Sequence, residues 1–345
     1  MYQAALPRPL ITIIMPIRNE ADFIARSLTA VLRQDYPAEL VEVLVVDGMS
    51  DDATRAEVYC TVAANPDSPL VTVLDNPGRI VPTGMNLALA RARGEIIVRV
   101  DGHCEIAPDY LRRCVEALTK TNAACVGGPM LTIGNSMAAR AIALAQSSPF
   151  GVGGVAFRTG RSEGSYVDTV AFGAYRREVF ERIGGFDEEL VRNQDDELNF
   201  RLTQAGGKIW LDPAIRSVYY SRASLRSLWQ QYYQYGLYKV RVIQKRGAVP
   251  SWRHLVPGFF VLALLGSLLL ALITHRPQLG LVVAGPYAAA NLTASLWTGR
   301  YELRTLPLLP PAFATLHLAY GLGFLVGLWR WRKDWDTRNA EEVLR

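Results

Sequence analysis

Hydrophobic residues in the first 220 positions occur in short continuous runs separated by segments with helical spacing. The runs are rich in β-branched residues, which predicts buried central strands. They cover residues 10–16, 41–47, 70–75 and 94–100. Between the first two, apolar residues recur at Ile24, Leu28, Val31 and Leu32, which predicts an amphipathic helix. Strands alternating with helices predict an α/β domain with a mostly parallel sheet and right-handed crossovers.

The pattern continues less regularly to about residue 220. Helices are predicted over 110–120, 177–183 and 195–205, and strands near 124–130, 167–175 and 208–211. Residues 134–165 are rich in glycine and serine, and we interpret them as a mobile insertion. Their glycine run, Gly151 to Gly154, is weak evidence for phosphate binding because no strand precedes it and no helix follows.

From residue 255 the chain changes class, and a long helix precedes that change. Residues 224–246 predict one long helix with aromatic residues on one side and cationic ones elsewhere, as on a membrane interface. The alternative is a soluble helix that packs on the domain. Apolar stretches follow at 257–274, 279–297 and 306–329. Three full crossings would put Arg330 and its cationic neighbours on the far side of the membrane, against the positive-inside tendency. If one span is re-entrant, the tail returns to the cytoplasmic side.

These patterns predict four parts. Residues 1–222 form the α/β domain, 223–254 an amphipathic interface helix and linker, 255–330 two or three transmembrane helices, and 331–345 a polar tail. No signal peptide is recognised before the first strand, so the first domain is expected in the cytoplasm.

Charge supports this division. Residues 1–215 carry 21 Lys and Arg against 27 Asp and Glu, whereas residues 216–345 carry 16 against 5. A basic part that is also the apolar part fits a membrane partner better than nucleic acid. The four cysteines have no C-x-x-C spacing, so neither a zinc site nor a disulfide framework is indicated.

A carboxylate and an imidazole follow the fourth strand, in Asp101-Gly102-His103. Ligands of open α/β sheets bind at the carboxyl ends of the strands. A carboxylate and an imidazole on one turn suit a divalent cation that leaves most of its coordination positions to a diphosphate. The alternative is an Asp that caps the turn beside a surface His.

Two further acidic clusters stand at strand or helix ends. Residues 47–52 (DGMSDD) close the second strand and could accept hydrogen bonds from a nucleobase or ribose, or could simply complement a helix dipole. Residues 193–197 (NQDDE) place three consecutive acids at a helix start. Capping explains only one of these, so another is a candidate general base.

Together these segments resemble family 2 glycosyltransferases of the GT-A fold. The V-D-D-G-S-x-D motif of that family matches residues 46–52, its A-R-G-E strand before D-x-D matches 92–101, and its E-D-x-D/E-L-x-x-R segment matches 194–201. The resemblance covers roughly residues 10–220. The D-G-H and Q-D-D-E-x-N-F-R-L segments are similar to membrane-anchored transferases of succinoglycan-type exopolysaccharide assembly.

The resemblance implies a role for each matched residue. Asp195 would be the catalytic base, and Asp101 with His103 would bind Mg²⁺ or Mn²⁺. The implied donor and substrate contacts are Asp47, Ser50, Asp52, Arg79, Asp101, Arg176, Asp196 and Arg201. Two departures are that His103 replaces the second acid of D-x-D and that Gln194 replaces the Glu before the base.

The implied reaction is an inverting transfer of a hexose from a nucleotide sugar, UDP-linked, to a polyprenyl-diphosphate-linked glycan during exopolysaccharide or cell-envelope polysaccharide synthesis. Because residues 234–238 (QYGLY) lack the Q-x-x-R-W motif of processive members, one sugar is expected per visit. The alternatives are a polyprenyl-phosphate acceptor and a non-catalytic, nucleotide-sugar-binding membrane scaffold. A dinucleotide-dependent oxidoreductase is not favoured, because this chain has no G-x-G-x-x-G motif after its first strand.

The expected location is the plasma (inner) membrane, crossed more than once, with the catalytic domain cytoplasmic. The expected partners are the nucleotide sugar, the lipid-linked acceptor, the membrane and other polysaccharide-assembly proteins, but no nucleic acid.

Overall fold

The computed structural model describes residues 8–333. Contacts between Cα atoms divide the chain into two compact units. Unit 1 is formed by Met1–Leu131 and Thr159–Tyr219, and unit 2 by Thr132–Arg158 and Tyr220–Arg345. The predicted tail, residues 331–345, lies mostly outside the described residues.

Unit 1 contains an eight-stranded sheet in the order β3-β2-β1-β4-β9-β6-β10-β8. Strands β1 to β4 are mutually parallel, as are β6 and β10, whereas β9 runs antiparallel to both β4 and β6. All seven residues of β1 and of β2 are buried, which is why their sequences are continuous apolar runs. The strands are β1 Ile11–Ile17, β2 Val41–Asp47, β3 Leu70–Asp75, β4 Ile96–Arg99, β6 Cys125–Gly128, β8 Ser165–Val167, β9 Ala171–Arg176 and β10 Ile209–Leu211.

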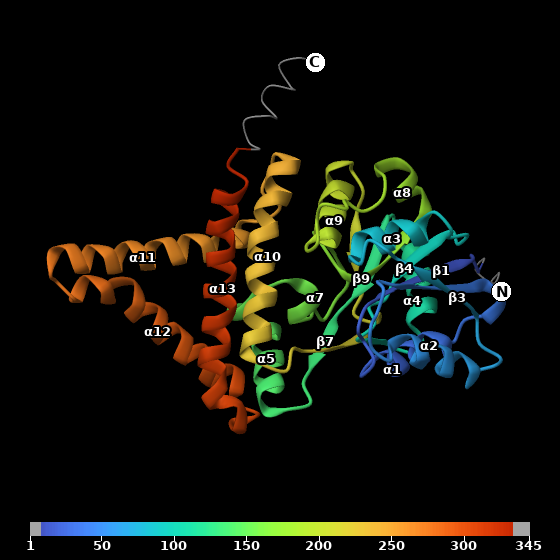
Figure 1. Ribbon diagram of the computed structural model, residues 1–345, viewed down its shortest axis with the longest axis horizontal. Coiled ribbons are helices and arrows are strands. Elements are labelled where there is room, and N and C mark those ends of the chain that lie inside the picture. Colours follow the sequence, from blue (N-terminus) through green and yellow to red (C-terminus); the bar gives the residue numbers. More distant parts are fainter. Residues whose placement is uncertain (1–7, 334–345) are drawn as a thin grey trace, which may run out of the picture. The chain divides into compact units, whose positions relative to one another are not determined.

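Helices lie on both sides of this sheet, with α3, α8 and α9 above it and α1 and α2 below it in Figure 1. Helix α1 buries Ile24, Leu28, Val31 and Leu32, the spacing expected of an amphipathic helix. The helices of unit 1 are α1 Ile24–Leu32, α2 Thr54–Ala63, α3 Val81–Leu89, α4 Tyr110–Lys120, α8 Arg177–Ile183 and α9 Gln194–Gln204, with the 3₁₀ turn η1 Ala38–Leu40. The predicted mostly parallel, Rossmann-like α/β domain is therefore confirmed.

A second, three-stranded sheet has the order β5-β11-β7, formed by Cys104–Ile106, Ser217–Tyr220 and Met130–Ile133. The chain passes from one unit to the other at three points, which lie in β7, in the short helix α7 Ala156–Thr159 and in β11.

Residues 134–158 are not the mobile insertion that their glycine and serine content predicted. They contain α5 Met137–Ser147, α6 Pro149–Val152 and the start of α7 Ala156–Thr159. Ser136 caps α5 by accepting a hydrogen bond from the Ala139 backbone N–H at 3.1 Å. Ala141, Ile142 and Ala145 join a buried apolar cluster with residues of α10 and α13. This segment therefore belongs to unit 2, and the predicted first domain of 1–222 is interrupted by it.

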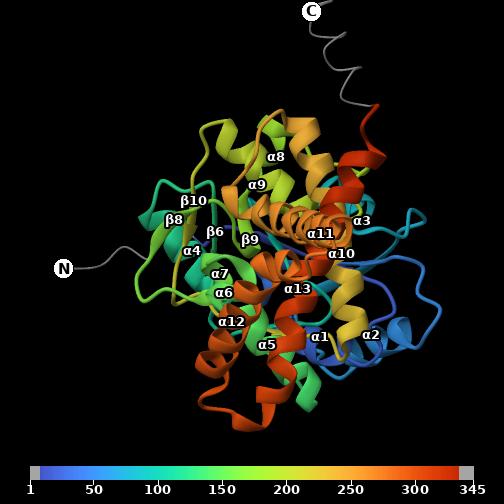
Figure 2. The ribbon, with the colours of Figure 1, turned by 90° about the vertical axis from the view of Figure 1, so that its left-hand side faces the viewer.

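Within the described residues, the rest of unit 2 consists mainly of four long helices. They are α10 Leu225–Arg246, α11 Val256–Thr274, α12 Gln278–Gly299 and α13 Leu309–Arg330, with short 3₁₀ turns η2 Trp252–His254 and η3 Leu303–Leu308. Within residues 8–333, three helical stretches are long and apolar enough to cross a membrane, and they contain α11, α12 and α13. Figures 1 and 2 show α10 running beside α13.

Candidate active site

The loop after β2 is held by the carboxylate of Asp47, the last residue of that strand. Asp47 is fully buried, and its Oδ1 accepts hydrogen bonds from the Ser50 backbone N–H at 3.0 Å and the Ser50 hydroxyl at 2.6 Å. Ser50 Oγ in turn accepts from the Asn19 backbone N–H at 3.0 Å. The loops after β1 and β2 are therefore joined at the carboxyl edge of the sheet.

The second oxygen of Asp47 has a different environment. Among the described residues Oδ2 has no hydrogen-bond partner, although Arg55 Nη1 lies 3.5 Å away and also binds Asp75 at 2.7 Å. A buried acceptor without a donor is costly unless a ligand supplies one. Asp47 is therefore suited to accept a hydrogen bond from a nucleoside.

Asp52 accepts backbone hydrogen bonds with both of its carboxylate oxygens. Its Oδ1 accepts from the Thr54 backbone N–H at 2.9 Å and its Oδ2 from the Ala21 backbone N–H at 3.3 Å. Hydrogen bonds from Thr54 and Ala21 lower the pKa of Asp52, against a smaller effect of burial. Both oxygens thus stabilise the start of α2 and tie it to the loop before α1.

Asp101 is clamped by an arginine two residues earlier. Arg99 donates from Nε to Oδ1 at 2.8 Å and from Nη2 to Oδ2 at 3.2 Å, a bidentate pair with both side chains largely buried. Burial alone would raise the pKa of Asp101, but Arg99, then His103 and also Arg192, bring it below its ordinary value. Asp101 is therefore held as a carboxylate in a fixed orientation.

His103 is oriented by a carboxylate from the loop after β1. Its Nδ1 lies 2.8 Å from Glu20 Oε1, and its ring contacts the Tyr219 ring edge to face at 5.0 Å between centroids. A carboxylate on one ring nitrogen, which leaves the other to bind a cation, is the usual arrangement of a metal-ligating histidine.

The three consecutive acids at the start of α9 separate into distinct roles. Asp195 Oδ1 accepts from the Asp196 backbone N–H at 2.9 Å, and its Oδ2 lies 3.7 Å from Arg99 Nη1. Glu197 is fully buried and forms a two-bond ion pair with Arg201 at 2.9 and 3.0 Å. Arg201 also donates to the carbonyl oxygens of Ile183 and Gly185. Arg201 therefore holds α9 against the preceding loop, and Asp195 lies beside Arg99 at the carboxyl edge of the sheet.

Arg99 is the residue of this site that sequence reasoning missed. It joins Asp101 to Asp195, which lie 94 positions apart in the chain. Burial would lower the pKa of Arg99, but Asp101 and Asp195 raise it above its ordinary value. The available signal was a single cation inside an otherwise apolar strand, where a charge needs a partner.

Two predicted arginines lie in different places. Arg79 is exposed in the turn before α3, and its carbonyl accepts a long hydrogen bond from Arg18 at 3.4 Å. Arg176 ends the antiparallel strand β9 and pairs with Ile96, the first residue of β4. It donates to the carbonyl oxygens of Leu118 and Ala123, at 2.6 and 3.1 Å. Arg176 is thus at the opposite edge of the sheet from Asp101, and its predicted donor contact is wrong.

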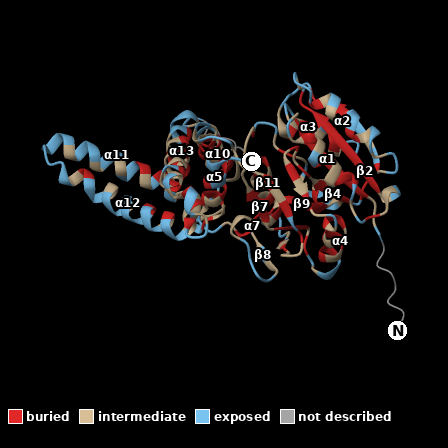
Figure 3. Ribbon diagram, turned by 90° about the horizontal axis from the view of Figure 1, so that it is seen from below, coloured by how far each residue is buried: buried red, intermediate tan, exposed pale blue. Residues whose placement is uncertain are grey.

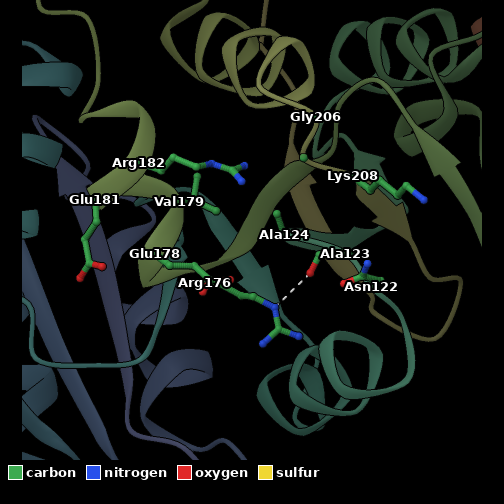
Figure 4. Close-up of a pocket in the computed structure, with 11 residues that line it drawn as sticks. Asn122, Ala123, Ala124, Arg176, Glu178, Val179, Glu181, Arg182, Gly206 and Lys208 are labelled. Carbon is green, nitrogen blue, oxygen red and sulfur yellow. Dashed lines mark hydrogen bonds between the residues drawn. The ribbon is translucent and has the colours of Figure 1, made fainter.

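Arg176 instead lines an open pocket of about 570 Å³ with Arg182, Lys208, Glu178 and Glu181, shown in Figure 4. The pocket is bordered by the residues before β6 and β10, at the amino ends of these strands. It therefore lies away from the acids described above.

Several residues with positive φ lie in the loops at the carboxyl edge of the sheet. Among the described residues, six that are not glycine have positive φ, and only His275 belongs to unit 2. Asn19, Met49 and Arg79 stand in the loops after β1, β2 and β3, and Asn193 precedes Asp195. The remaining one is Phe172. Such conformations gather at sites where the surrounding structure holds them for a function.

The donor set fits a divalent cation that takes most of its ligands from elsewhere. No group of three His, Cys, Asp or Glu able to hold a metal is found in the part of the chain that the structure describes. Asp101 and His103 would supply two ligands, which fits the way Mg²⁺ is bound by one or two side chains and by substrate phosphates.

Comparisons with known proteins agree with this geometry. The family model described as Glycosyl transferase family 2 matches residues 12–184. The chain is 34% identical over 331 residues to the succinoglycan biosynthesis protein ExoA of Rhizobium meliloti (strain 1021), covering 95% of this chain and 96% of that protein.

A second relative is an archaeal enzyme. The dolichyl N-acetyl-alpha-D-glucosaminyl phosphate 3-beta-D-2,3-diacetamido-2,3-dideoxy-beta-D-glucuronosyltransferase of Methanococcus voltae is 29% identical over 269 residues, covering 76% of this chain and 82% of that protein. Among solved structures, the mannosyltransferase PcManGT from Pyrobaculum calidifontis, in complex with GDP-Man and Mn²⁺, aligns with a TM-score of 0.60 and 23% identity, over 94% of this chain and 88% of that one. This last likeness shows the fold.

Proposed function

This chain belongs to glycosyl transferase family 2, and from that premise we propose that it moves one hexose per visit, with inversion, from a UDP-linked sugar to a glycan carried on polyprenyl diphosphate. The reaction would serve exopolysaccharide or cell-envelope polysaccharide synthesis. The observation that carries the proposal is that Arg99 brings Asp101 and Asp195 together at the same edge of the sheet as Asp47.

Each acid has an environment suited to one step. Asp47 presents a buried oxygen to the nucleoside. Asp195 has a side chain that is 47% exposed, so it can meet an acceptor hydroxyl and take its proton. A base on the side opposite the departing diphosphate gives in-line attack and inversion. We propose that Ser50, Asp52 and Arg201 position these groups through the loops, and that Arg79 and Asp196 contact the donor.

Asp101 and His103 would hold Mg²⁺ or Mn²⁺, which supplies positive charge against the departing nucleoside diphosphate. Arg99 keeps Asp101 ionised and aimed, so the ligand oxygen is already in place before the donor arrives.

Three observations support the acceptor and the location. The name of the Rhizobium relative places it in succinoglycan synthesis, and that of the Methanococcus relative describes a dolichyl-linked sugar. Helices long enough to cross a membrane follow the transferase domain. We therefore propose an inner-membrane protein whose catalytic unit is cytoplasmic and whose acceptor is lipid-linked.

The test is Asp195→Asn, which removes the base and keeps the shape of the side chain. We expect transfer of labelled sugar to lipid extract to fall about 10²- to 10⁴-fold. The melting temperature should change little because Asp195 is half exposed. The matched control is Asp67→Asn, at an exposed position after α2, which should leave turnover unchanged. Near-normal turnover of Asp195→Asn would exclude this residue as the base, and product analysis with polyprenyl phosphate against a polyprenyl-diphosphate glycan identifies the acceptor.

A further inference from the structure

The three apolar helices of unit 2 are not equally exposed. In the stretches long enough to span a membrane, 11% of the residues are buried for α11 and 17% for α12, but 44% for α13. Figure 3 shows α11 and α12 mostly in the colour of exposed residues. Leu309, Phe313 and Leu316 of α13 are instead packed in a cluster with α5 and α10. Helix α13 is therefore covered by protein along much of its surface.

Helix α10 lies directly against α13 and runs parallel to it. A Cβ atom added at Gly236 would stand 2.0 Å from the Tyr320 carbonyl oxygen, and one added at Gly323 would stand 2.1 Å from the Tyr233 carbonyl oxygen. Near the other end, Gln244 Nε2 donates to the Trp331 carbonyl oxygen at 2.9 Å. The two helices are thus in backbone contact over most of their lengths, and they must lie at the same depth in any membrane.

The composition of α10 excludes the hydrocarbon layer for this pair. The helix carries five Lys and Arg, four Gln and no acid in 22 residues. Charged side chains are strongly disfavoured at the centre of a bilayer, whereas an interface accepts them beside aromatic residues. Because α13 cannot enter the membrane without α10, its apolar sequence reflects packing on α5 and α10 and contact with the interface.

We infer that only α11 and α12 cross the bilayer, as a hairpin, and that α13 lies with α10 at the surface from which the hairpin enters. The chain then crosses twice, and the residues after α13 return to the side of η2. This inference rests on the proposed membrane anchorage and is independent of the transferase chemistry.

The hairpin has the dimensions and the surface that this requires. Helices α11 and α12 have 19 and 22 residues, or about 28 and 33 Å at 1.5 Å per residue, against a hydrocarbon core of about 30 Å. Leu265, Leu269 and Leu281 are at least half exposed. In Figures 1 and 3 the hairpin extends away from the α10–α13 pair and across its direction, so a hairpin that spans the bilayer places the pair along its surface.

Among the described residues, the side-chain hydrogen bonds from the hairpin to other elements are made by α12 from Tyr287 onward. Tyr287 of α12 donates its hydroxyl to His317 Nδ1 at 3.0 Å, because His317 Nε2 donates to the Phe150 carbonyl at 2.9 Å. Asn291 donates to the Pro310 carbonyl at 3.1 Å. Toward the tip, Ser267 bonds only to a carbonyl of its own helix. This distribution matches a hairpin whose end near α13 lies beside protein at the interface and whose stretch between that end and the tip lies in hydrocarbon.

The positions of charged and aromatic residues also place the end of the hairpin near α13 at the membrane interface. Trp252, Trp297 and Trp329 are exposed at the end of the hairpin near α13 or on α13 itself, and residues 261–286 contain no aromatic residue. Two crossings leave one cation, Arg276, at the tip. The cations that flank the helices at the other end are Arg253, Arg300, Arg304, Arg330, Arg332 and Lys333. Such a distribution obeys the positive-inside tendency, which three crossings would weaken.

The test uses single cysteines in the full chain with exposed Cys60 replaced by Ser. Arg276→Cys reports the tip, Lys333→Cys the end after α13, and Arg304→Cys the turn between α12 and α13. All three positions are exposed, so folding should be retained. Intact cells are treated with a membrane-impermeant maleimide before and after permeabilisation. We expect Arg276→Cys to label fully in intact cells, and the other two to label only after permeabilisation.

Two outcomes would contradict the inference in different ways. Labelling of both Arg276→Cys and Lys333→Cys in intact cells would show three crossings and overturn it. Protection of all three cysteines in intact cells, with release of the chain by alkaline carbonate, would show that no segment crosses and would remove the proposed anchorage as well. Transfer activity, measured in parallel, keeps either result separate from the proposed reaction.

Discussion

The two units achieve close packing in different ways. Unit 1 buries charges and pairs each of them, as Arg99 with Asp101 and Glu197 with Arg201. Unit 2 brings backbones into contact by omitting side chains, as at Gly236 and Gly323. The first solution fixes the direction of carboxylate oxygens, and the second fixes α10 closely against α13. Unit 1 should therefore be sensitive to loss of charge, and unit 2 to gain of volume.

Arg99→Met should produce the largest loss of stability. It leaves Asp101, whose side chain is only 20% exposed, without its partner. Breaking a buried ion pair on one side costs about 3–5 kcal/mol, so the melting temperature should fall by several degrees. Under the proposed function, binding of the nucleotide sugar and transfer should fall as well, because Asp101 loses its fixed orientation.

Arg99→Lys separates charge from geometry. A lysine keeps the positive charge but cannot form the two parallel hydrogen bonds. We expect it to recover most of the melting temperature and little of the transfer rate. Equal stability of Arg99→Met and the parent chain would show that the pair is not needed for the fold.

Gly323→Ala should come next in size and should affect unit 2. The added methyl would meet the Tyr233 carbonyl oxygen at 2.1 Å, so the α10 and α13 backbones must move apart. Overpacking of this kind costs about 1–3 kcal/mol. Gly266→Ala in α11 is the matched control, because a Cβ there meets nothing within 4 Å. It should be neutral or stabilising by up to about 1 kcal/mol. If the two substitutions have the same effect on the melting temperature in detergent, the contact of the two helices is not close.

Much of the fold of unit 1 can be predicted from the sequence, because the patterns that indicate its strands are local. Continuous apolar runs predicted β1 and β2, and the order of strands in the sequence predicted that Asp47 and Asp101 stand at the carboxyl ends of strands, where the structure has them. Arg176 was misplaced because a parallel strand would have ended at the functional edge, whereas β9 runs antiparallel and ends at the other. No local pattern tells the direction of a single strand. Arg99 was missed for a related reason, since its second partner, Asp195, comes from a distant helix.

Unit 2 shows where hydropathy alone is insufficient. Composition found α11, α12 and α13 as apolar segments but does not distinguish lipid from protein as the neighbour of an apolar face. The apolar face of α5 was hidden for a similar reason, because its alanines lie in a stretch that glycine and serine made look irregular. In both cases the deciding information is the partner helix, which the one-dimensional pattern does not contain.

The smallest effect that still distinguishes the units is their response to acid. Glu42 in β2 is buried and accepts hydrogen bonds from Thr12 at 2.5 Å and from the Arg93 side chain at 2.8 Å. Burial would raise the pKa of Glu42, but these hydrogen bonds and the charge of Arg93 bring it below its ordinary value. A folded-state pKa below the unfolded value means that the stabilisation is present above about pH 4.3 and is lost as the pH falls through the folded pKa.

Glu42→Gln tests this sign. The amide cannot ionise, so it should cost about 1 kcal/mol at neutral pH through weaker hydrogen bonds. The difference in melting temperature from the parent chain should then shrink as the pH is lowered below about 4. The parent loses the stabilisation from its ionised carboxylate, which the variant lacks at every pH. Helices α11, α12 and α13 contain no Asp or Glu, so acid has no carboxylate to protonate there. A difference that stays constant from neutral to acid pH would mean that Glu42 contributes through its shape and not its charge, and the contrast between a charge-paired unit and a close-packed one would then be weaker at this strand.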